Sequence, residues 1–232
     1  MLFLKFGEKE HLQQLKDGVV HFRPLSSFVN DSTRFRGDRL EATLLIDTSY
    51  PVIINGTDYS PYIKEATQTF VGFDSILSFS AAKLDHNNCH AIEDGLFTLN
   101  DDFIAEMEQF GSHFLIFSAG EFVQGLEESL EKYTCNYLYR SIFYCDKTDH
   151  AAISEHFRDI EGIVESYEYC FIKDYTPYAK QNEWRIIIHD INSKFRIEDS
   201  GGVNVKTNFN TKMPIFETTA LKTLRVSKEF LN

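Results

Sequence analysis

Apolar residues recur along this chain with two different spacings, one typical of strands and one typical of helices. Dense or alternating runs of β-branched and aromatic residues predict strands at Leu2–Phe6, Val19–Arg23, Ser75–Ser80, His113–Ser118, Leu138–Cys145, Tyr169–Ile172 and Asn182–His189. Apolar residues three or four apart predict helices at Glu8–Asp17, Asn100–Phe110, Glu121–Tyr133 and Ala151–Tyr167, the last being the longest. The polar segments Asn30–Glu41 and Lys83–Asp94 are expected to be a loop and a loop or short helix, respectively.

The order of these elements predicts the fold class. Helices cluster in the middle of the chain, strands occur throughout, and the last forty residues read as short strands separated by turns. A doubly wound parallel sheet would need regular alternation of strands and helices, so this order argues against it. We find no linker, composition break or repeat and therefore expect one α+β domain over residues 1–232, with mixed or antiparallel sheets and helices.

Composition and charge narrow the function classes. The 232 residues are 43% hydrophobic and 25% charged, which is typical of a globular chain that buries roughly 70% of its unfolded surface. Lys and Arg number 23 against 35 Asp and Glu, so the net charge of −12 disfavours a broad groove for nucleic acid or anionic lipid. There is no apolar run long enough to span a bilayer and no secretory leader, so we expect a cytoplasmic protein with no membrane partner and reduced cysteines.

The segment from Asp174 to Ile188 carries the most informative pattern. On a strand, Gln181, Glu183 and Arg185 share one face, and the following run of three isoleucines predicts burial on both faces. An ionised Glu183 is costly there unless it is paired. Two interpretations remain: Glu183 pairs with an Arg or Lys across the strand and fixes its register, or it lines a cleft, binds a hydroxyl and stabilises a cation. Burial against a basic neighbour with no space alongside would contradict the second.

Gln181-x-Glu183 at the start of a strand, after a loop that carries Tyr175 and Tyr178, resembles the motif of NAD-dependent ADP-ribosyltransferases. The resemblance implies an ADP-ribosyltransferase-like split β core, NAD as co-substrate and no metal. It also implies that Glu183 holds a ribose hydroxyl and supports the oxocarbenium-like state as nicotinamide leaves, while Gln181 orients the acceptor. Because the nicotinamide–ribose bond is glycosidic, its cleavage places positive charge on the sugar, where one carboxylate is worth a few kcal/mol.

Two earlier segments extend this resemblance. Ser78-Phe79-Ser80 is similar to the Ser-Thr-Ser element of that family, in which a hydroxyl braces the catalytic acid and the others shape the nicotinamide pocket. The family also places an Arg or His on an early strand to hold NAD. This chain offers His21, Arg23 or Lys5, and none of them forms an unambiguous motif.

The opening layout is similar to a widespread group of uncharacterised bacterial proteins, some linked to phage defence. It consists of a strand, a helix, a second strand and then a loop rich in Arg and Asp that contains GDRLE. Members of that group share the late Glu-Trp-Arg strand. The resemblance implies a toxin or abortive-infection effector with a macromolecular acceptor and a neutralising antitoxin partner.

The loop from Asn30 to Glu41 has two interpretations. Asp38 and Glu41 would neutralise its arginines on a solvated surface, or the arginines would grip a phosphate of a dinucleotide or of an RNA acceptor. The arginines are Arg34, Arg36 and Arg39. With Tyr175 and Tyr178 for base stacking and Arg185 nearby, Arg34 and Arg36 would form an acceptor site for single-stranded RNA, whereas the acidic chain argues for a protein acceptor.

Two other function classes stay open. In a non-enzymatic binding or sensor module, Glu183 and Arg185 would be a buried structural pair. A metal-dependent nuclease would need clustered carboxylates, for which Asp38, Glu41 and Glu183 are candidates. His86, Cys89 and His90 have helical ligand spacing for zinc, but no third or fourth ligand follows at a recognisable distance.

Overall fold

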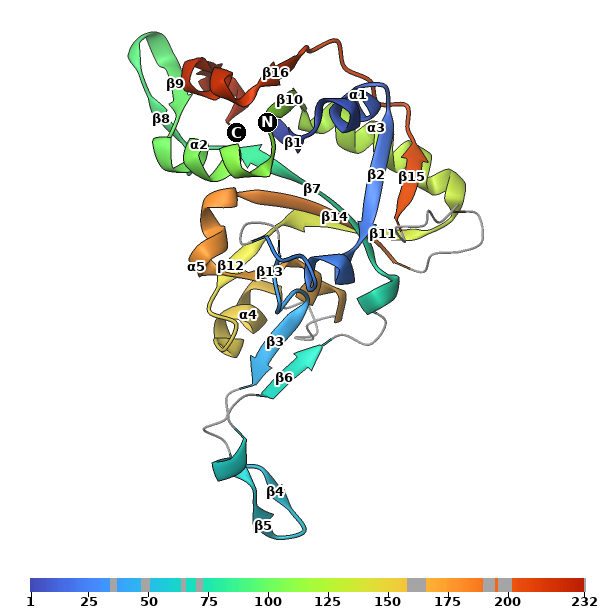
Figure 1. The fold of residues 1–232 in the computed structure, drawn as a ribbon, viewed down its shortest axis with the longest axis vertical. Helices are drawn as coiled ribbons and strands as arrows, with labels where there is room; N and C mark the ends of the chain where they lie inside the picture. Colours follow the sequence, from blue (N-terminus) through green and yellow to red (C-terminus); the bar gives the residue numbers. More distant parts are fainter. Residues whose placement is uncertain are drawn as a thin grey trace.

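The computed structural model shows a mixed α+β protein with antiparallel sheets and several helices (Figure 1). It describes residues 1–33, 37–46, 51–63, 66–69, 73–157, 166–189, 195 and 202–231. The described helices are α1 (Lys9–Lys16), α2 (Asp101–Met107), α3 (Ala119–Tyr133), α4 (His150–Phe157) and α5 (Tyr175–Tyr178). The 3₁₀ segments used below are η1 (Leu25–Phe28), η5 (Glu108–Phe110), η6 (Ser166–Phe171), η7 (Ala179–Gln181) and η8 (Thr218–Thr223).

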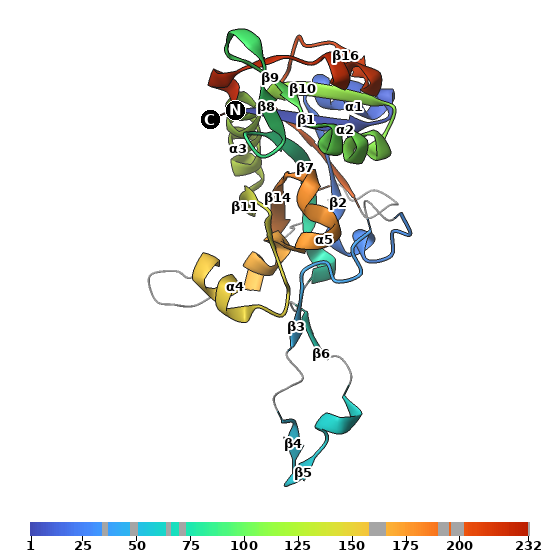
Figure 2. The same cartoon turned by 90° about the vertical axis from the view of Figure 1, so that its left-hand side faces the viewer.

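A central antiparallel sheet organises the molecule. Its strand order is β11-β14-β7-β1-β10-β16, and β2 joins β7 and also pairs with β15. The bounds of these strands are β1 (Leu2–Gly7), β2 (Val19–Pro24), β7 (Leu77–Leu84), β10 (His113–Ser118), β11 (Asn136–Ser141), β14 (Glu183–His189), β15 (Val203–Lys206) and β16 (Ile215–Glu217). The chain termini lie close together beside this sheet in both views (Figures 1 and 2).

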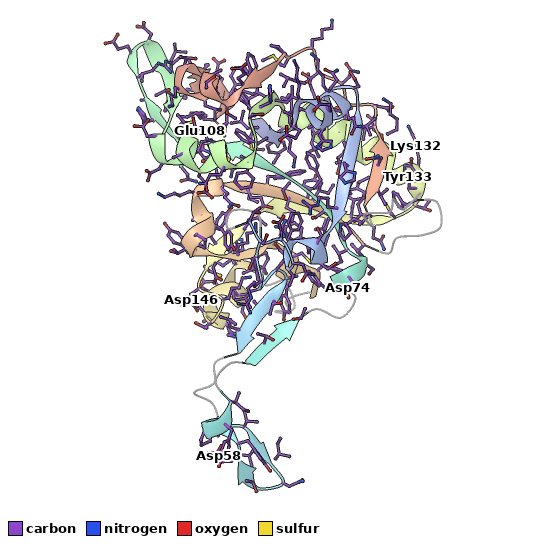
Figure 3. The ribbon with its side chains drawn as sticks, viewed as in Figure 1. Asp58, Asp74, Glu108, Lys132, Tyr133 and Asp146 are labelled. Atoms are coloured by element: carbon purple, nitrogen blue, oxygen red, sulfur yellow. The ribbon has the colours of Figure 1, made fainter. Side chains whose placement is uncertain are left out.

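Smaller ladders surround the central sheet. They pair β12 (Phe143–Cys145) with β13 (Ile172–Asp174), β3 (Thr43–Ile46) with β6 (Ala66–Thr69), β4 (Ile53–Ile54) with β5 (Thr57–Asp58), and β9 (Leu96–Leu99) with β8 (Cys89–Ala91) and β17 (Val226–Ser227). The β12–β13 ladder is parallel, so the sheets are mixed overall. The β4–β5 hairpin lies away from the body in both views, and Figure 3 labels Asp58 on it.

Helix packing divides the buried side chains into clusters on the two faces of the sheet. One cluster packs α1 and α3 on one face, through residues such as Leu15 and Phe122 against Phe3 and Trp184. A second packs α2 on Leu4 of the other face. A third joins α4 and η6 to the β14 residue Ile187. The sheet is therefore covered on both sides, as its apolar runs predict.

The sheet forks at β7, and this fork positions the site described below. Along one edge β7 pairs with β14, from Leu77 to Ala82. Along its other edge it pairs with β2 at Leu77 and Ser78, and with β1 at 82–84. Between these two ladders, residues 79–81 pair with β14 alone among the described strands. The strands β1 and β2 therefore separate, and the sheet opens between them.

Local sequence explains the elements that flank the fork. Leu12 and Leu15 are the buried residues of α1, and Gly18 follows the helix with φ +82°. A Cβ at Gly18 would lie 2.4 Å from the Phe209 carbonyl oxygen, so both the conformation and the space require glycine. This turn sends the chain from α1 directly into β2.

Most predicted elements are confirmed, with a few informative errors. The predicted strand 138–145 is two strands in different sheets, β11 and β12. The strand predicted at 75–80 extends to Leu84, so it includes two residues of the predicted polar loop, which also contains β8. Tyr169–Ile172 is mostly 3₁₀ helix rather than strand. The predicted helix 151–167 is seen over α4, residues 158–165 lie outside the described residues, and Tyr167 lies in η6.

Candidate functional site

A cavity of about 670 Å³ lies at the fork between β1 and β2. Its volume is in the range of small-molecule and cofactor sites. Its lining brings together residues that the sequence singled out on separate segments, namely Lys5, His21, Arg23, Ser78, Ser80, Gln181, Glu183 and Arg185. The fork creates this convergence, because it leaves space where a continuous sheet would have a strand.

Glu183 lies on the cavity wall beside Ser80. The Ser80 hydroxyl donates to the Glu183 Oε1 atom at 2.5 Å across the β7–β14 ladder. The backbone explains this pairing, since Ser80 is directly opposite Arg185 and on the same sheet face as Glu183. The Glu183 N–H donates to the Tyr144 hydroxyl at 2.8 Å, which fixes the start of the strand.

Two cations clasp the Glu183 carboxylate. Lys173 Nζ lies 2.7 Å from Oε2, and Arg185 Nε lies 2.9 Å from Oε1. Burial alone raises the pKa of Glu183, but the charges of Arg185 and Lys173 and the hydrogen bonds from Lys173 and Ser80 outweigh it and hold the pKa well below its usual range. The carboxylate is therefore ionised. It is paired with basic neighbours, as the first interpretation expected, and it also has an open cavity beside it.

Arg185 is locked in place by a second carboxylate. Its guanidinium donates to Glu41 Oε1 at 2.6 Å and Oε2 at 3.3 Å, and to the Cys170 carbonyl oxygen at 2.6 Å. Arg185 and Glu41 are each only 1% exposed. The prediction that Glu183 pairs with a cation across the strand is therefore wrong, because Arg185 lies on the same strand and Lys173 lies on β13. Four of the five guanidinium N–H groups are used within the protein, which leaves one for a predicted acceptor.

Gln181 lies in η7 and not on the strand. Asn182 has a left-handed conformation with φ 44°, so β14 begins at Glu183 and the predicted shared strand face does not extend to Gln181. Gln181 nevertheless lines the cavity, and its amide donates to Glu106 Oε1 of α2 at 3.2 Å. The kink at Asn182, and not strand alternation, therefore brings Gln181 to the wall of this cavity.

Two residues of the cavity lining, Ser78 and Arg23, have hydrogen-bonding groups that the described part of the protein does not use. They are directly opposite each other in the short β2–β7 ladder. Ser78 Oγ is buried and has no hydrogen-bond partner among the residues that the structure describes. Within the described residues, the Arg23 guanidinium faces the Phe28 ring at 5.0 Å and has no carboxylate partner. A buried hydroxyl without a partner is costly, which indicates a ligand group here.

The other predicted NAD-binding residues lie on the same cavity. Lys5 Nζ donates to the Ser80 carbonyl oxygen at 2.5 Å, at the edge of β7 that lacks a strand neighbour. The His21 Nδ1 atom lies 2.8 Å from Asn204 Oδ1. Both His21 and Asn204 line the cavity, so β15 also contributes to it.

The two tyrosines predicted to contact the acceptor differ in exposure. Tyr175 is 66% exposed at the start of α5, whereas Tyr178 is 8% exposed. The Tyr178 hydroxyl donates to the Gly37 carbonyl oxygen at 2.6 Å. Of the two rings, only that of Tyr175 is available for stacking on a base.

Asp38 and Glu41 of the 30–41 loop are buried, so the solvated surface predicted for these two residues is wrong. Asp38 is 2% exposed and lies 3.3 Å from Lys147 Nζ, which also donates to the Leu40 carbonyl oxygen. Glu41 binds Arg185 as described above. Arg39 is exposed, and Arg34 and Arg36 lie outside the described residues. Asp38 and Glu41 therefore bind cations of the protein interior, Lys147 and Arg185.

The charges on the cavity wall oppose the charge of the chain. Among the lining residues, the four Lys and Arg side chains are Lys5, Arg23, Lys173 and Arg185, and the two carboxylates are Glu8 and Glu183. Four positive and two negative charges line the wall, and Glu41 behind it neutralises Arg185, which leaves a local excess of one positive charge in a chain whose net charge is −12. The cavity therefore favours an anionic ligand.

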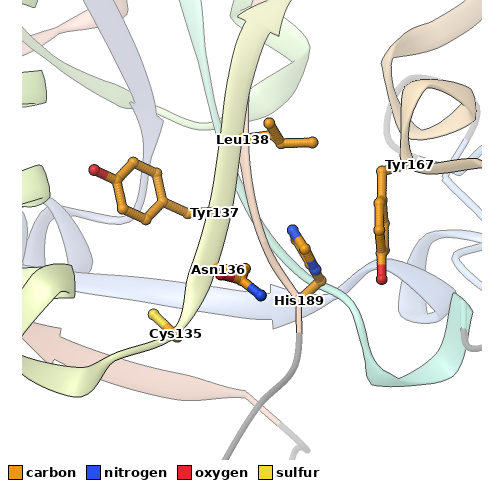
Figure 4. Close-up of a pocket in the computed structure, with 6 residues that line it drawn as sticks. All are labelled: Cys135, Asn136, Tyr137, Leu138, Tyr167 and His189. Carbon is orange, nitrogen blue, oxygen red and sulfur yellow. The ribbon is translucent and has the colours of Figure 1, made fainter. Parts of the chain in front are cut away.

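A second hollow of about 370 Å³ lies at the other end of β14 (Figure 4). Tyr167 stacks on His189 there, with ring centroids 3.9 Å apart. The other lining residues are Cys135, Asn136, Tyr137 and Leu138. No Lys, Arg, Asp or Glu is among them, so this hollow lacks the charge that distinguishes the cavity at the fork.

The described residues offer no metal centre. Within the part of the chain that the structure describes, no three His, Cys, Asp or Glu side chains gather closely enough to hold a metal ion. His90 instead pairs through Nδ1 with Asn100 Oδ1 at 2.9 Å, and Cys89 is buried.

Lys173 and Tyr144 are site residues that sequence reasoning missed, and Glu41 was considered only as a partner of the loop arginines or as a carboxylate of a nuclease. Lys173 comes ten residues before Glu183, on the short strand β13, where alternation is too brief to assign a face. Glu41 follows a polar loop that reads as solvated. The charges on β14 could have indicated them. A strand that is buried on both faces and carries one Glu and one Arg requires further charged partners from other segments of the chain.

Comparison with known protein families, curated proteins and solved structures finds no match for this chain. None of the described helices combines the length and apolar composition needed to cross a bilayer.

Proposed function

We propose that this protein transfers ADP-ribose from NAD to a macromolecular acceptor, and that its forked sheet is an ADP-ribosyltransferase-like split β core. The observation that carries the proposal is the Ser80–Glu183 hydrogen bond on the wall of the cavity at the fork. It places an ionised carboxylate, braced by a hydroxyl, beside a space in which a sugar can lose its leaving group.

The chemistry requires a fixed anion near the sugar. Departure of nicotinamide breaks a glycosidic bond and leaves an oxocarbenium-like ribosyl group, whose positive charge Glu183 stabilises while it accepts a hydrogen bond from a ribose hydroxyl. The pKa of Glu183 lies well below its usual range because Arg185 and Lys173 outweigh the effect of burial, so the carboxylate stays ionised at neutral pH. The acceptor nucleophile then attacks the anomeric carbon and gives up its proton.

The same cavity suits the remainder of a dinucleotide. Arg23, which has no carboxylate partner among the described residues, and Lys5 supply positive charge for the pyrophosphate. Ser78 supplies the buried hydroxyl that lacks a partner, and we assign it to the nicotinamide carboxamide. His21 lies further along β2 on the same wall.

The acceptor side is proposed at Gln181 and the exposed Tyr175. Gln181 orients the nucleophile from η7, and Tyr175 contacts the acceptor beyond the cavity. Protein and RNA acceptors share these two residues. An RNA acceptor would in addition use Arg34 and Arg36 for its phosphates, whereas the acidic chain favours a protein.

Incubation with labelled NAD and a cell lysate tests the reaction. We expect label transfer by the wild type and at least a hundredfold loss in Glu183→Gln, which keeps the size of the side chain but not its charge. Asp102→Asn is the matched control, because Asp102 is an exposed carboxylate that pairs with Lys180 and with no other cation of the described residues. The proposal fails if a folded wild type transfers no label, or if Glu183→Gln transfers as much as wild type. Nuclease and protease treatment of the product identifies the acceptor class.

As an effector of bacterial phage defence, the protein is expected to arrest growth when expressed. Glu183→Gln should relieve the arrest, and a neutralising antitoxin protein should do the same for the wild type. Equal growth of cells that express the wild type and the variant would count against the toxin role even if NAD is cleaved.

A non-enzymatic binding module is the second candidate. The clasp of Glu183 by Lys173 and Arg185 favours it, because an ion pair of this kind can serve structure alone. This candidate expects a bound anion in the cavity and no turnover. The nuclease alternative has no such support, since Asp38 and Glu41 each bind an internal cation.

A further inference from the structure

The two cations on Glu183 are held very differently. Arg185 has three partners besides its bond to Glu183: both oxygens of Glu41 and the Cys170 carbonyl oxygen. In the part of the chain that the structure describes, Lys173 Nζ has one hydrogen-bonded partner, Glu183 Oε2 at 2.7 Å, and it lies 5.0 Å from the centroid of the Tyr178 ring. Arg185 therefore cannot leave Glu183 without breaking a buried network, whereas Lys173 can leave by giving up a single ion pair.

This difference matters for the chemistry. The positive charges of Lys173 and Arg185 balance the negative charges of Glu183 and Glu41, so Glu183 in the empty cavity has little charge left to stabilise a cationic sugar. Lys173 also lines the cavity, where positive charges exceed negative ones. A phosphate that enters the cavity is a second anion within reach of a flexible lysine stem, and ammonium groups bind phosphate as point charges.

We infer that Lys173 is a positioning residue that exchanges partners: it holds Glu183 in the empty cavity and moves onto a phosphate of the bound dinucleotide. This inference rests on the proposed function. The exchange leaves Glu183 with one fixed cation, Arg185, and with an oxygen free to accept a ribose hydroxyl. Binding of the phosphate therefore also frees the charge of Glu183. When a sugar without phosphates binds, Lys173 stays on Glu183 and the sugar meets a neutralised carboxylate.

A double-mutant cycle on ADP binding tests the exchange without requiring turnover. The four proteins are wild type, Lys173→Met, Glu183→Gln and the double variant, and calorimetry measures their dissociation constants for ADP. We expect Lys173→Met to weaken ADP binding about tenfold. Glu183→Gln should tighten it at least threefold, because the ammonium no longer has to leave a carboxylate. In the Lys173→Met background this tightening should be lost. The matched control is Lys180→Met, an exposed lysine outside the cavity lining, which should bind ADP as wild type does.

Additive effects in the cycle would overturn the inference, as would failure of the wild type to bind ADP. A crystal structure of the wild type with ADP is a second measurement that needs no variant to fold. Its Lys173 Nζ to Glu183 Oε2 distance should exceed 4 Å, and a distance that stays near 2.7 Å with ADP bound would contradict the exchange. NAD cleavage is measured separately. Non-additive effects on ADP binding without NAD cleavage would support the exchange and contradict the proposed function. NAD cleavage with additive effects on ADP binding would support the proposed function and contradict the exchange.

Discussion

The two faces of β14 are both buried, but by different physical means. One face carries Trp184, Ile186 and Ile188, which pack into the cluster beneath α1 and α3. At the start of the other face, Glu183 and Arg185 are buried by ion pairs and line the cavity at the fork. Neighbouring residues of one strand therefore belong either to a packed core or to a charged wall.

The difference shows which residues stability alone explains. Burial of apolar side chains is directly favourable, so Trp184 and the isoleucines need no other justification. Burial of charges costs desolvation, and well-packed apolar residues in place of a buried ion pair are often as stable or more so. Stability alone therefore does not explain why Glu183, Arg185 and Glu41 are buried here, and a function is expected at the cavity beside them.

The largest effect is expected on the apolar face. Trp184 lies with its ring centroid 4.7 Å from that of Phe3 and 6.2 Å from that of Phe122. Trp184→Ala should lower the free energy of unfolding by about 4 kcal/mol, because it leaves a cavity in this cluster. Urea unfolding measures the change. Trp184→Phe should cost less, and an equal cost for both would show that the indole makes a contribution other than filling space.

A slightly smaller loss is expected on the charged wall. Glu41→Gln leaves Arg185 with a neutral partner in a buried position, and we expect the free energy of unfolding to fall by about 3 kcal/mol. Asp102→Asn breaks the exposed pair with Lys180 and should cost less than about 1 kcal/mol. Similar costs for the two variants in urea unfolding would contradict the assignment of Glu41 to a buried network.

The smallest effect is a pH dependence that only the charged wall should show. The pKa of Glu183 is lower in the folded than in the unfolded protein, so its ionised form stabilises the fold above the unfolded pKa of about 4.3. Below that pH the unfolded state takes up the proton first, and this contribution falls by about 1.4 kcal/mol per pH unit. The stability difference between wild type and Glu183→Gln should therefore shrink from pH 5 to pH 3. A constant difference in urea unfolding across these pH values would contradict the depressed pKa.

Sequence patterns predicted the helices and strands that have a strong apolar periodicity or that end at a clear signal such as a glycine. Strand β10 matches its predicted bounds, and α1 ends before Gly18, where φ is positive. Errors occur where the pattern is short or where a partner strand decides the outcome. The segment 138–145 reads as one strand, but its halves pair with β14 and with β13 in different sheets.

For the site, the sequence singled out Ser78, Ser80 and Glu183, and the structure places all three along one cavity. Lys173 and Glu41 were not assigned to it. Their charges look like those of any surface residue, because burial of a charged side chain is decided by what packs around it and leaves no periodic signal in the chain.

By itself, the amino-acid sequence determined the strand and helix content, the apolar face of β14 and the presence of a Glu and an Arg on a strand too apolar to be exposed. These follow from interactions between residues that are near one another in the chain. Only the tertiary structure decided that β7 forks between β1 and β2, that a cavity opens there, and that Glu41 and Lys173 complete the charges around Glu183 and Arg185. The physical reason is that strand pairing and ion pairing join residues far apart in the chain, 144 positions in the case of Glu41 and Arg185, and the energies that select such partners exist only once the chain has folded.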